Sequence, residues 1–163
     1  MTLDGVIPTS IAGLALRELR PNDGETFYAL VQKNRAHLTA LGDFEQEVAA
    51  PLEKWVDDFS AHPGAGRRFG IYLSEQLIGR LDLIAVDPPR YSVGYWLAED
   101  AIGHGYASAA LARVVALARD ELGASGIYAG VTHGNDRSEA LLERLGFVRV
   151  AEFERYARFH LPL

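Results

Sequence analysis

The sequence predicts an α/β domain with a mixed, largely antiparallel sheet and helices on both of its faces. Short runs with alternating apolar residues recur along the chain, and three of them follow one another between residues 69 and 97. Segments with apolar residues at helical spacing lie before and after these runs. A length of 163 residues suits one domain with a stable core, so we expect a single domain over residues 1–163.

The first half of the chain predicts one strand, two helices and an antiparallel meander. Residues 14–19 alternate well enough for a strand, and the capping residue Asp23 precedes a helix expected over residues 24–33. A second helix is expected over residues 51–59, and it ends at a loop, residues 61–68, that we expect to be mobile. The meander is expected from three strands, over residues 69–73, 77–84 and 91–97.

After the meander, helices and strands alternate. Apolar residues between Leu111 and Leu122 fall on one helical face, and Gly123 suits the end of that helix. A helix between two strands implies a right-handed parallel crossover within residues 91–132. The remaining expected elements are a strand over residues 127–132, a helix over residues 135–145 and strand-like segments over residues 147–161.

The composition excludes several classes of function. The chain has no cysteine, which excludes a disulfide framework, a cysteine nucleophile and a cysteine-ligated metal. A net charge of -6 without a basic run argues against binding nucleic acid. The first twenty residues lack a basic targeting pattern, and Arg113 interrupts the longest apolar stretch. We therefore expect a cytoplasmic protein that binds neither nucleic acid nor membrane.

A glycine turn over residues 101–108 joins the third meander strand to the long helix. Gly103 and Gly105 allow a bare backbone to approach the helix N-terminus, where unpaired N–H groups attract anions. This arrangement predicts a site for a phosphorylated cofactor, although an ordinary turn before a helix remains an alternative. A dinucleotide fingerprint would need glycine at Ser108, and a P-loop would need Gly-Lys-Ser/Thr, so neither fits.

Five segments stand in a fixed order along the chain: Asn34–Leu38, Val93–Leu97, Gly103–Ala107, Asn135–Ser138 and Leu145–Phe147. Together they resemble the GCN5-related N-acetyltransferase family and its branch of ribosomal-protein N-terminal acetyltransferase-like proteins. The resemblance covers most of the chain and implies one N-acetyltransferase domain with a splayed parallel strand pair that binds the cofactor. It also implies acetyl transfer from acetyl-coenzyme A to a primary amine by direct attack in a ternary complex.

The resemblance also implies roles for individual residues. The backbone of the splayed strand pairs with the pantetheine arm, and the N–H near Leu97 faces the acetyl carbonyl. Asn135 bonds to the cofactor or its loop, and Ser138 is the candidate general acid toward the leaving thiolate. Both residues also suit helix capping. The cofactor residues expected are Tyr95, Trp96 and Leu97 for the pantetheine, and Gly103, His104, Gly105, Tyr106 and Ala107 for the pyrophosphate.

The sequence departs from the family pattern at two places. Ile102 stands where the family usually has Gln or Arg, so we expect the backbone, not side chains, to hold the cofactor. The last strands are short, which puts the acceptor side in question. The acceptor amine must lose a proton, and Asp82 and Glu152 are candidate bases, although each also suits a solvent-exposed face. The five histidines form no chelating spacing, so no metal is expected.

Alternatives to this enzyme remain open at this point. A non-catalytic module that binds or senses acyl-coenzyme A would also explain the missing polar residue and the absence of a clear base. A different nucleotide enzyme is the second alternative. The expected partner is an amine acceptor, either a small molecule or a protein N-terminus, and a homodimer is an open alternative to a monomer.

Overall fold

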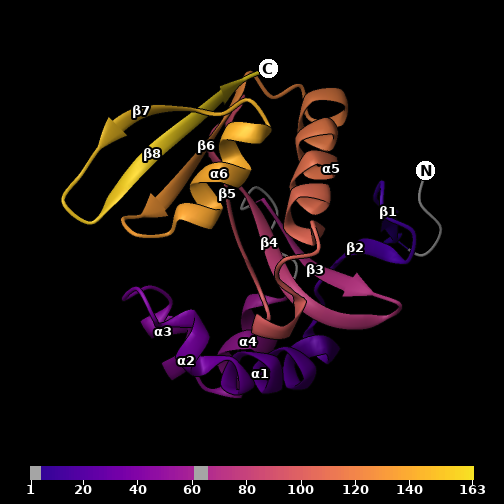
Figure 1. Cartoon of the computed structure of the whole chain (residues 1–163). Coiled ribbons are helices and arrows are strands. Elements are labelled where there is room, and N and C mark those ends of the chain that lie inside the picture. The colour runs from indigo at the N-terminus through magenta and orange to yellow at the C-terminus, as the bar shows by residue number, and fades with distance from the viewer. Residues whose placement is uncertain (1–4, 61–65) are drawn as a thin grey trace.

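The structure is a computed structural model that describes residues 5–60 and 66–163, and it consists of one sheet with helices packed on both faces (Figure 1). Residues 61–65 of the loop that we expect to be mobile lie outside the described residues. The strands are β1 (Ile7–Pro8), β2 (Leu14–Glu18), β3 (Arg67–Leu73), β4 (Gln76–Asp87), β5 (Arg90–Leu97), β6 (Gly126–Thr132), β7 (Val148–Glu152) and β8 (Tyr156–Pro162).

The α-helices lie mainly where the sequence predicts them. The helix expected over residues 24–33 is confirmed as α1, and the other three expected helices begin and end within a few residues of the predicted bounds. Two short helices between α1 and the next expected helix were not predicted. No helix in the described part of the chain is both long and apolar enough to cross a membrane. The helices are α1 (Gly24–Lys33), α2 (Arg35–Leu38), α3 (Glu45–Ala49), α4 (Leu52–Asp58), α5 (Tyr106–Glu121) and α6 (Asp136–Arg144).

The sheet confirms the expected topology. Within the described residues its order is β1-β2-β3-β4-β5-β6-β8-β7, and β3, β4 and β5 form the antiparallel meander. The pair β5–β6 is parallel and is joined through α5, as the crossover predicts, whereas the other neighbours are antiparallel. The sheet is therefore mixed and largely antiparallel.

The parallel pair separates before its strands end. Backbone pairing joins Arg90–Val93 of β5 to Gly126–Ala129 of β6, and the register goes no further along these two strands. Beyond this point β5 stays paired with β4, and β6 stays paired with β8. The strands consequently diverge and leave a wedge-shaped opening, which is the splayed pair that the family resemblance implies.

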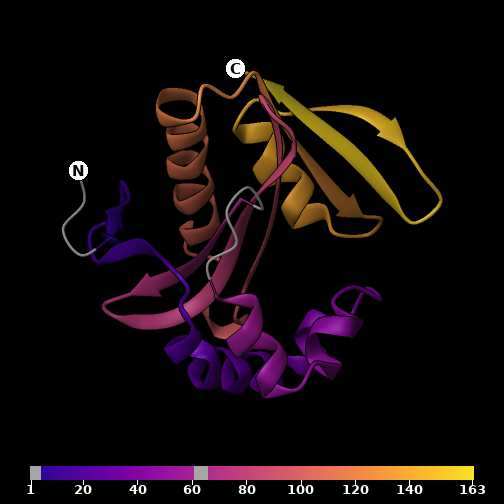
Figure 2. The same cartoon turned by 180° about the vertical axis from the view of Figure 1, so that it is seen from behind.

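Two apolar cores lie on opposite faces of the sheet. One core contains α5 and α6, and within it Leu111, Val114 and Ala118 of α5 are fully buried, as their helical spacing predicts. The second core contains α1 to α4, which lie together below the sheet when the molecule is seen from behind (Figure 2). Trp96 of β5 joins this second core. The central strands are thus covered on both faces.

Burial on both faces places an ion pair of β4 inside the protein. Arg80 and Asp82 lie on the face of α1 and α4, where the Arg80 guanidinium is 5.7 Å from the Phe27 ring centroid and 5.9 Å from that of Trp55. The Arg80 Nε and Asp82 Oδ2 atoms are 3.4 Å apart, and the two side chains are only 11% and 13% exposed. Burial raises the pKa of Asp82, and the positive charge of Arg80 opposes this rise. Asp82 is therefore a core residue and does not lie on a solvent-exposed face.

We expect the substitution Asp82→Ala to destabilise the fold by about 3 to 5 kcal/mol, because it leaves the Arg80 charge buried without its counter-ion. The matched control is Asp87→Ala, at the end of β4, which removes an exposed ion pair with Arg90 of β5 and is expected to leave the unfolding midpoint almost unchanged. Urea unfolding of both variants measures the difference. Equal midpoints for the two variants would contradict a buried structural role for Asp82.

Candidate functional site

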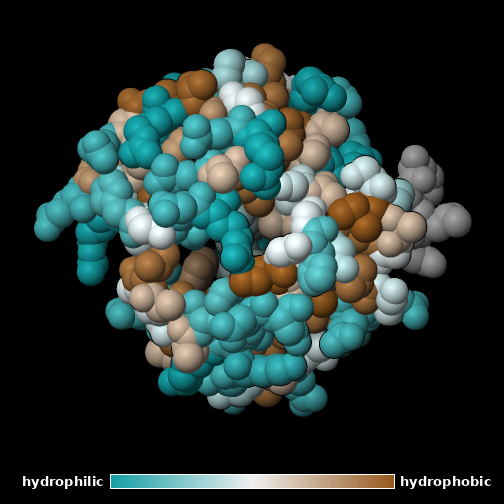
Figure 3. All heavy atoms as spheres, in the orientation of Figure 1, coloured by the Kyte–Doolittle hydropathy of each residue, from teal (hydrophilic) through white to brown (hydrophobic). Residues whose placement is uncertain are grey.

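A cleft opens where β5 and β6 diverge. Its volume is about 590 Å³, and Figure 3 shows the surface hollowed between the part that carries α6 and the part that carries α1 to α3. Its lining comes from four regions: the α2–α3 segment (His37, Leu38, Ala40, Leu41, Asp43, Phe44), the end of β5 (Tyr95, Trp96, Leu97), the glycine turn with the start of α5 (Ile102, Gly103, Gly105, Tyr106, Ala107, Ser108) and the start and inner side of α6 (Gly134, Asn135, Arg137, Ser138, Leu141, Arg144).

The glycine turn exposes the N-terminus of α5 to the cleft. Gly103 and Gly105 have φ angles of +87° and +80°, a left-handed conformation that glycine adopts without strain. A Cβ atom built on either glycine meets no described atom within 4 Å, so the space in front of the backbone is open. His104 is exposed and its ring stacks against that of Tyr106, with 5.3 Å between centroids. The first amides of α5 can therefore receive an anion directly.

The end of β5 presents unpaired backbone groups to the opening. The Ala98 N–H donates to the Ile78 carbonyl at 2.7 Å, which fixes the alternation of the β4–β5 ladder. By this alternation Trp96 directs its backbone toward β4, while Tyr95 and Leu97 direct theirs toward the side of β6, beyond the point where that pairing ends. Of the three residues expected to pair with pantetheine, Tyr95 directs its backbone groups to the opening and Leu97 its N–H, because the Leu97 carbonyl is in contact with His37. Trp96 contributes its side chain to the lining.

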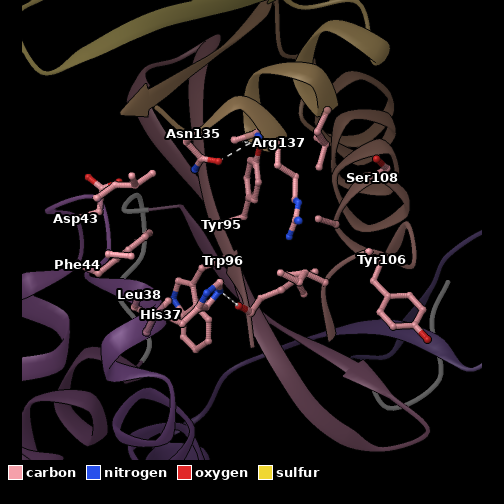
Figure 4. Close-up of a pocket in the computed structure, with 18 of the residues that line it drawn as sticks. His37, Leu38, Asp43, Phe44, Tyr95, Trp96, Tyr106, Ser108, Asn135 and Arg137 are labelled. Atoms are coloured by element: carbon pink, nitrogen blue, oxygen red, sulfur yellow. Dashed lines mark hydrogen bonds between the residues drawn. The ribbon is translucent and has the colours of Figure 1, made fainter. Parts of the chain in front are cut away.

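Two hydroxyl groups meet on the inner side of the cleft. The Tyr95 hydroxyl and the Ser138 Oγ atom lie 2.6 Å apart, and the Ser138 N–H donates to the Asn135 Oδ1 atom at 3.2 Å (Figure 4). Asn135 is thus the N-cap of α6 and fixes the turn that carries Ser138. Burial raises the pKa of Tyr95, and the hydrogen bond with Ser138 and the charge of Arg144 partly offset this rise.

The opposite wall of the cleft is tied to the sheet by side chains of the N-terminal helices. His37 Nε2 lies 3.2 Å from the Leu97 carbonyl oxygen. Asn34, which is buried, accepts a hydrogen bond from the Glu99 N–H at 2.9 Å. Asp43 accepts a hydrogen bond of 2.6 Å from the Thr132 hydroxyl of β6. These contacts hold α2 and the segment before α3 against the mouth of the wedge.

Charged side chains in the cleft were not assigned a role from the sequence. Arg137 extends from α6 into the cleft (Figure 4), and Arg144 bridges to α5 through a hydrogen bond of 3.1 Å to Ser108 Oγ. Asp43 is the single carboxylate among the described residues that line the cleft. Because Arg137 lies inside the motif Asn135–Ser138, that motif could have indicated that Arg137 lines the cleft. No local sequence pattern indicated the same for Asp43.

The two candidate bases lie away from the cleft. Asp82 belongs to the buried ion pair on the α1 and α4 side of the sheet. Glu152 is exposed on β7, where its Oε1 atom lies 3.5 Å from the Arg149 Nη1 atom. Neither residue contributes to the lining formed by the described residues. Within residues 5–60 and 66–163 there is also no group of three or more histidine, aspartate or glutamate side chains that could hold a metal ion.

Known proteins resemble this chain in sequence. The family described as Acetyltransferase (GNAT) domain matches residues 14–148. Among curated proteins, the Putative ribosomal N-acetyltransferase YdaF of Bacillus subtilis (strain 168) is 25% identical over 146 residues, which cover 83% of this chain and 78% of that protein.

Solved structures share the fold at low sequence identity. RimJ of Mycobacterium smegmatis, in complex with CoA-disulfide, has a TM-score of 0.83 at 23% identity, with coverage of 96% of this chain and 86% of that one. RimL, a ribosomal L7/L12 alpha-N-protein acetyltransferase in complex with Coenzyme A, has a TM-score of 0.86 at 20% identity, covering 97% and 98%. A dodecameric spermidine N-acetyltransferase from Vibrio cholerae has a TM-score of 0.72 at 23% identity, covering 93% and 95%.

The burial of Tyr95 and its hydrogen bond with Ser138 predict opposite effects on the pKa of this tyrosine. Because burial raises the pKa of Tyr95, this side chain should ionise above pH 10, and Ser138→Ala should move its ionisation to still higher pH by removing the hydrogen bond that lowers it. The folded protein then holds more protons than the unfolded chain above about pH 10, so the free energy of unfolding contributed by Tyr95 falls as pH rises.

Ultraviolet difference titration against Tyr95→Phe isolates this tyrosine from the other six. A shift to lower pH in Ser138→Ala would show that the two hydroxyls do not interact in this way.

Proposed function

Because this chain belongs to the Acetyltransferase (GNAT) domain family, we propose that it transfers an acetyl group from acetyl-coenzyme A to a primary amine. The observation that supports this most is the meeting of two features in one cleft. The wedge between β5 and β6 offers unpaired backbone groups, and it ends beside the open N-terminus of α5. An extended amide-containing arm that ends in a pyrophosphate fits both features at once.

The residues present suit the cofactor. The amides of residues 103–107 would hold the pyrophosphate, since they lie at the positive end of the α5 dipole and no Cβ blocks Gly103 or Gly105. The backbone groups of Tyr95 would pair with the amides of the pantetheine arm, since the Leu97 carbonyl is in contact with His37. Ile102 lines the cleft without a polar group, which leaves the backbone as the main contact with the phosphates. When bound, acetyl-coenzyme A supplies the activated acetyl group.

Three groups of this chain would serve the transfer itself. The Leu97 N–H faces the opening and would donate to the acetyl oxygen as negative charge develops there. The Ser138 hydroxyl would protonate the departing thiolate, and Tyr95, 2.6 Å away, would orient that hydroxyl. Asn135 would act through the helix cap that places Ser138. Asp82 and Glu152 receive no part in this mechanism because both lie outside the cleft.

The acceptor is a primary amine, and the cleft offers Asp43 as a carboxylate that attracts its ammonium form. Relatives suggest two acceptor classes, because one is named as a ribosomal N-acetyltransferase and another as a spermidine N-acetyltransferase. We propose a protein N-terminus or a small-molecule amine. A cytoplasmic location, a homodimer and one domain over residues 1–163 stay predictions of the sequence.

The proposed function predicts both binding and turnover. Calorimetry should show binding of coenzyme A, and release of free thiol from acetyl-coenzyme A should accelerate when a panel of peptides and polyamines is added. Tight binding without thiol release for any amine would instead support the non-catalytic module that senses acyl-coenzyme A. Binding of NAD or ATP to the protein, without binding of coenzyme A, would contradict the proposed cofactor.

Ser138→Ala should lower the turnover number by about 100-fold or more, because general acid catalysis contributes effects of about that size. Binding of coenzyme A should not change, since the hydroxyl acts on the departing sulfur. The matched control is Ser125→Ala, on the exposed turn before β6, which should keep full activity. Full turnover of Ser138→Ala across the pH range would remove Ser138 from the mechanism.

Gly105→Ala and Gly123→Ala form a matched pair. They test whether the backbone amides of residues 103–107, here called the phosphate cradle, hold the pyrophosphate. Both glycines have positive φ angles, +80° and +63°, and neither has a described atom within 4 Å of an added Cβ. Both substitutions should therefore cost a similar amount of stability, about 1 to 2 kcal/mol. Only Gly105 lies in the cleft, so only Gly105→Ala should weaken binding of coenzyme A, by at least about tenfold. Equal affinities in calorimetry would place the pyrophosphate elsewhere.

A further inference from the structure

His37 of α2 has a fixed tautomer. Its Nε2 atom lies 3.2 Å from the Leu97 carbonyl oxygen, and Figure 4 shows the contact at the lower edge of the cleft. A carbonyl oxygen can only accept a hydrogen bond, so the hydrogen must be on Nε2. In the neutral imidazole, the other ring nitrogen, Nδ1, then carries a lone pair and can accept a proton.

The Nδ1 atom is free to receive that proton. Among the described residues it has no hydrogen-bond partner, and it is not one of the fully buried polar atoms that lack a partner. The His37 side chain is half-buried and lines the cleft. His37 thus carries a proton-accepting nitrogen on a ring that lines the cleft.

The imidazole is held beside the proposed reaction centre. Leu97 receives its hydrogen bond through the carbonyl, and the N–H of the same residue is the group that we propose faces the acetyl oxygen. Asn34, one helical turn before His37, accepts a hydrogen bond from the Glu99 N–H and fixes the same end of β5. Leu97 and His37 are thus positioned together, 60 residues apart in sequence.

We propose that His37 is the general base that deprotonates the acceptor ammonium, an inference that rests on the proposed acetyl transfer. The ammonium gives one proton to Nδ1, and the free amine forms the C–N bond with the acetyl carbon. The C–S bond then breaks, its electron pair leaves on sulfur, and the thiolate takes a proton from the Ser138 hydroxyl. The amide nitrogen loses its second proton, which restores that hydroxyl, and His37 releases its own proton to solvent. The net change is one proton released for each acetyl group transferred.

Other titratable groups face the same cleft and must stay in place during the test. They are Asp43 before α3, Tyr95 of β5, Tyr106 of α5, and Arg137 and Arg144 of α6. Asp43 already accepts a hydrogen bond from Thr132, and Tyr95 is paired with Ser138. Because all of them are retained in every variant, a change in the pH dependence can be assigned to residue 37.

The test compares His37→Gln with His37→Phe. The glutamine amide can donate to the Leu97 carbonyl but cannot take up a proton, whereas phenylalanine loses both properties. The matched control is His133→Gln, because His133 also contacts a backbone carbonyl through Nε2, at 2.7 Å from Phe153, and is not part of the cleft lining. Each variant is measured for the pH dependence of kcat/KM with an amine acceptor, for binding of coenzyme A and for thermal unfolding.

We expect His37→Gln to lose about 100-fold in kcat/KM at neutral pH, with unchanged binding of coenzyme A and unchanged unfolding. Its rate should recover as pH rises toward the pKa of the acceptor amine, because free amine then forms without a base. The control should match the original protein throughout.

Three other results would overturn the proposal. Full activity in His37→Gln with a loss in His37→Phe would make His37 a positioning residue that only holds Leu97. Full activity in both variants would remove His37 from the reaction. If the original protein transfers acetyl groups to no amine, the proposed function itself fails and this inference fails with it, a result distinguishable from the other two.

Discussion

Strands β5 and β6 pair only through Arg90–Val93 and Gly126–Ala129, and every part of the cleft depends on this early end of their ladder. Each strand remains fully supported along its other edge, because β5 continues to pair with β4 and β6 continues to pair with β8. The sheet therefore holds the two strands apart without any group inside the wedge. Unpaired backbone groups inside a protein are costly unless water or a ligand satisfies them, so this geometry suits a partner with amides of its own.

Contacts between distant segments hold the N-terminal helices at the mouth of this wedge. His37 binds the Leu97 carbonyl, Asn34 binds the Glu99 N–H, and Asp43 binds Thr132. Each contact joins the N-terminal segment of residues 34–43 to a residue on or next to β5 or β6, at least 60 positions further along the chain. The short helices α2 and α3 have little stability of their own, and these bonds, with the second apolar core, determine where they lie. Tertiary contacts therefore define the side of the cleft that is formed by α2 and the segment before α3.

Elements that follow a local sequence pattern could be predicted from the sequence, whereas segments positioned by tertiary contacts could not. Periodic segments such as α1 and the meander strands were predicted with nearly correct ends, and the ordered motifs indicated the splayed pair and the glycine turn. Asp82 was misjudged because alternation along a strand does not reveal whether its second face is covered, and here α1 and α4 cover it. The side-chain contacts of Tyr95 and His37 are with residues 43 and 60 positions away, which no local pattern encodes.

The cradle at Gly103 and Gly105 uses backbone conformation, and this has a consequence for how the sequence can evolve. A contact made by an amide survives replacement of most neighbouring side chains, provided that the two glycines and the helix behind them are kept. Ile102, which replaces a polar residue of the family pattern, illustrates this freedom. The lining contributed by residues 37–44 can therefore vary in sequence without changing the glycine turn, and solved structures share this fold at 20% to 23% identity.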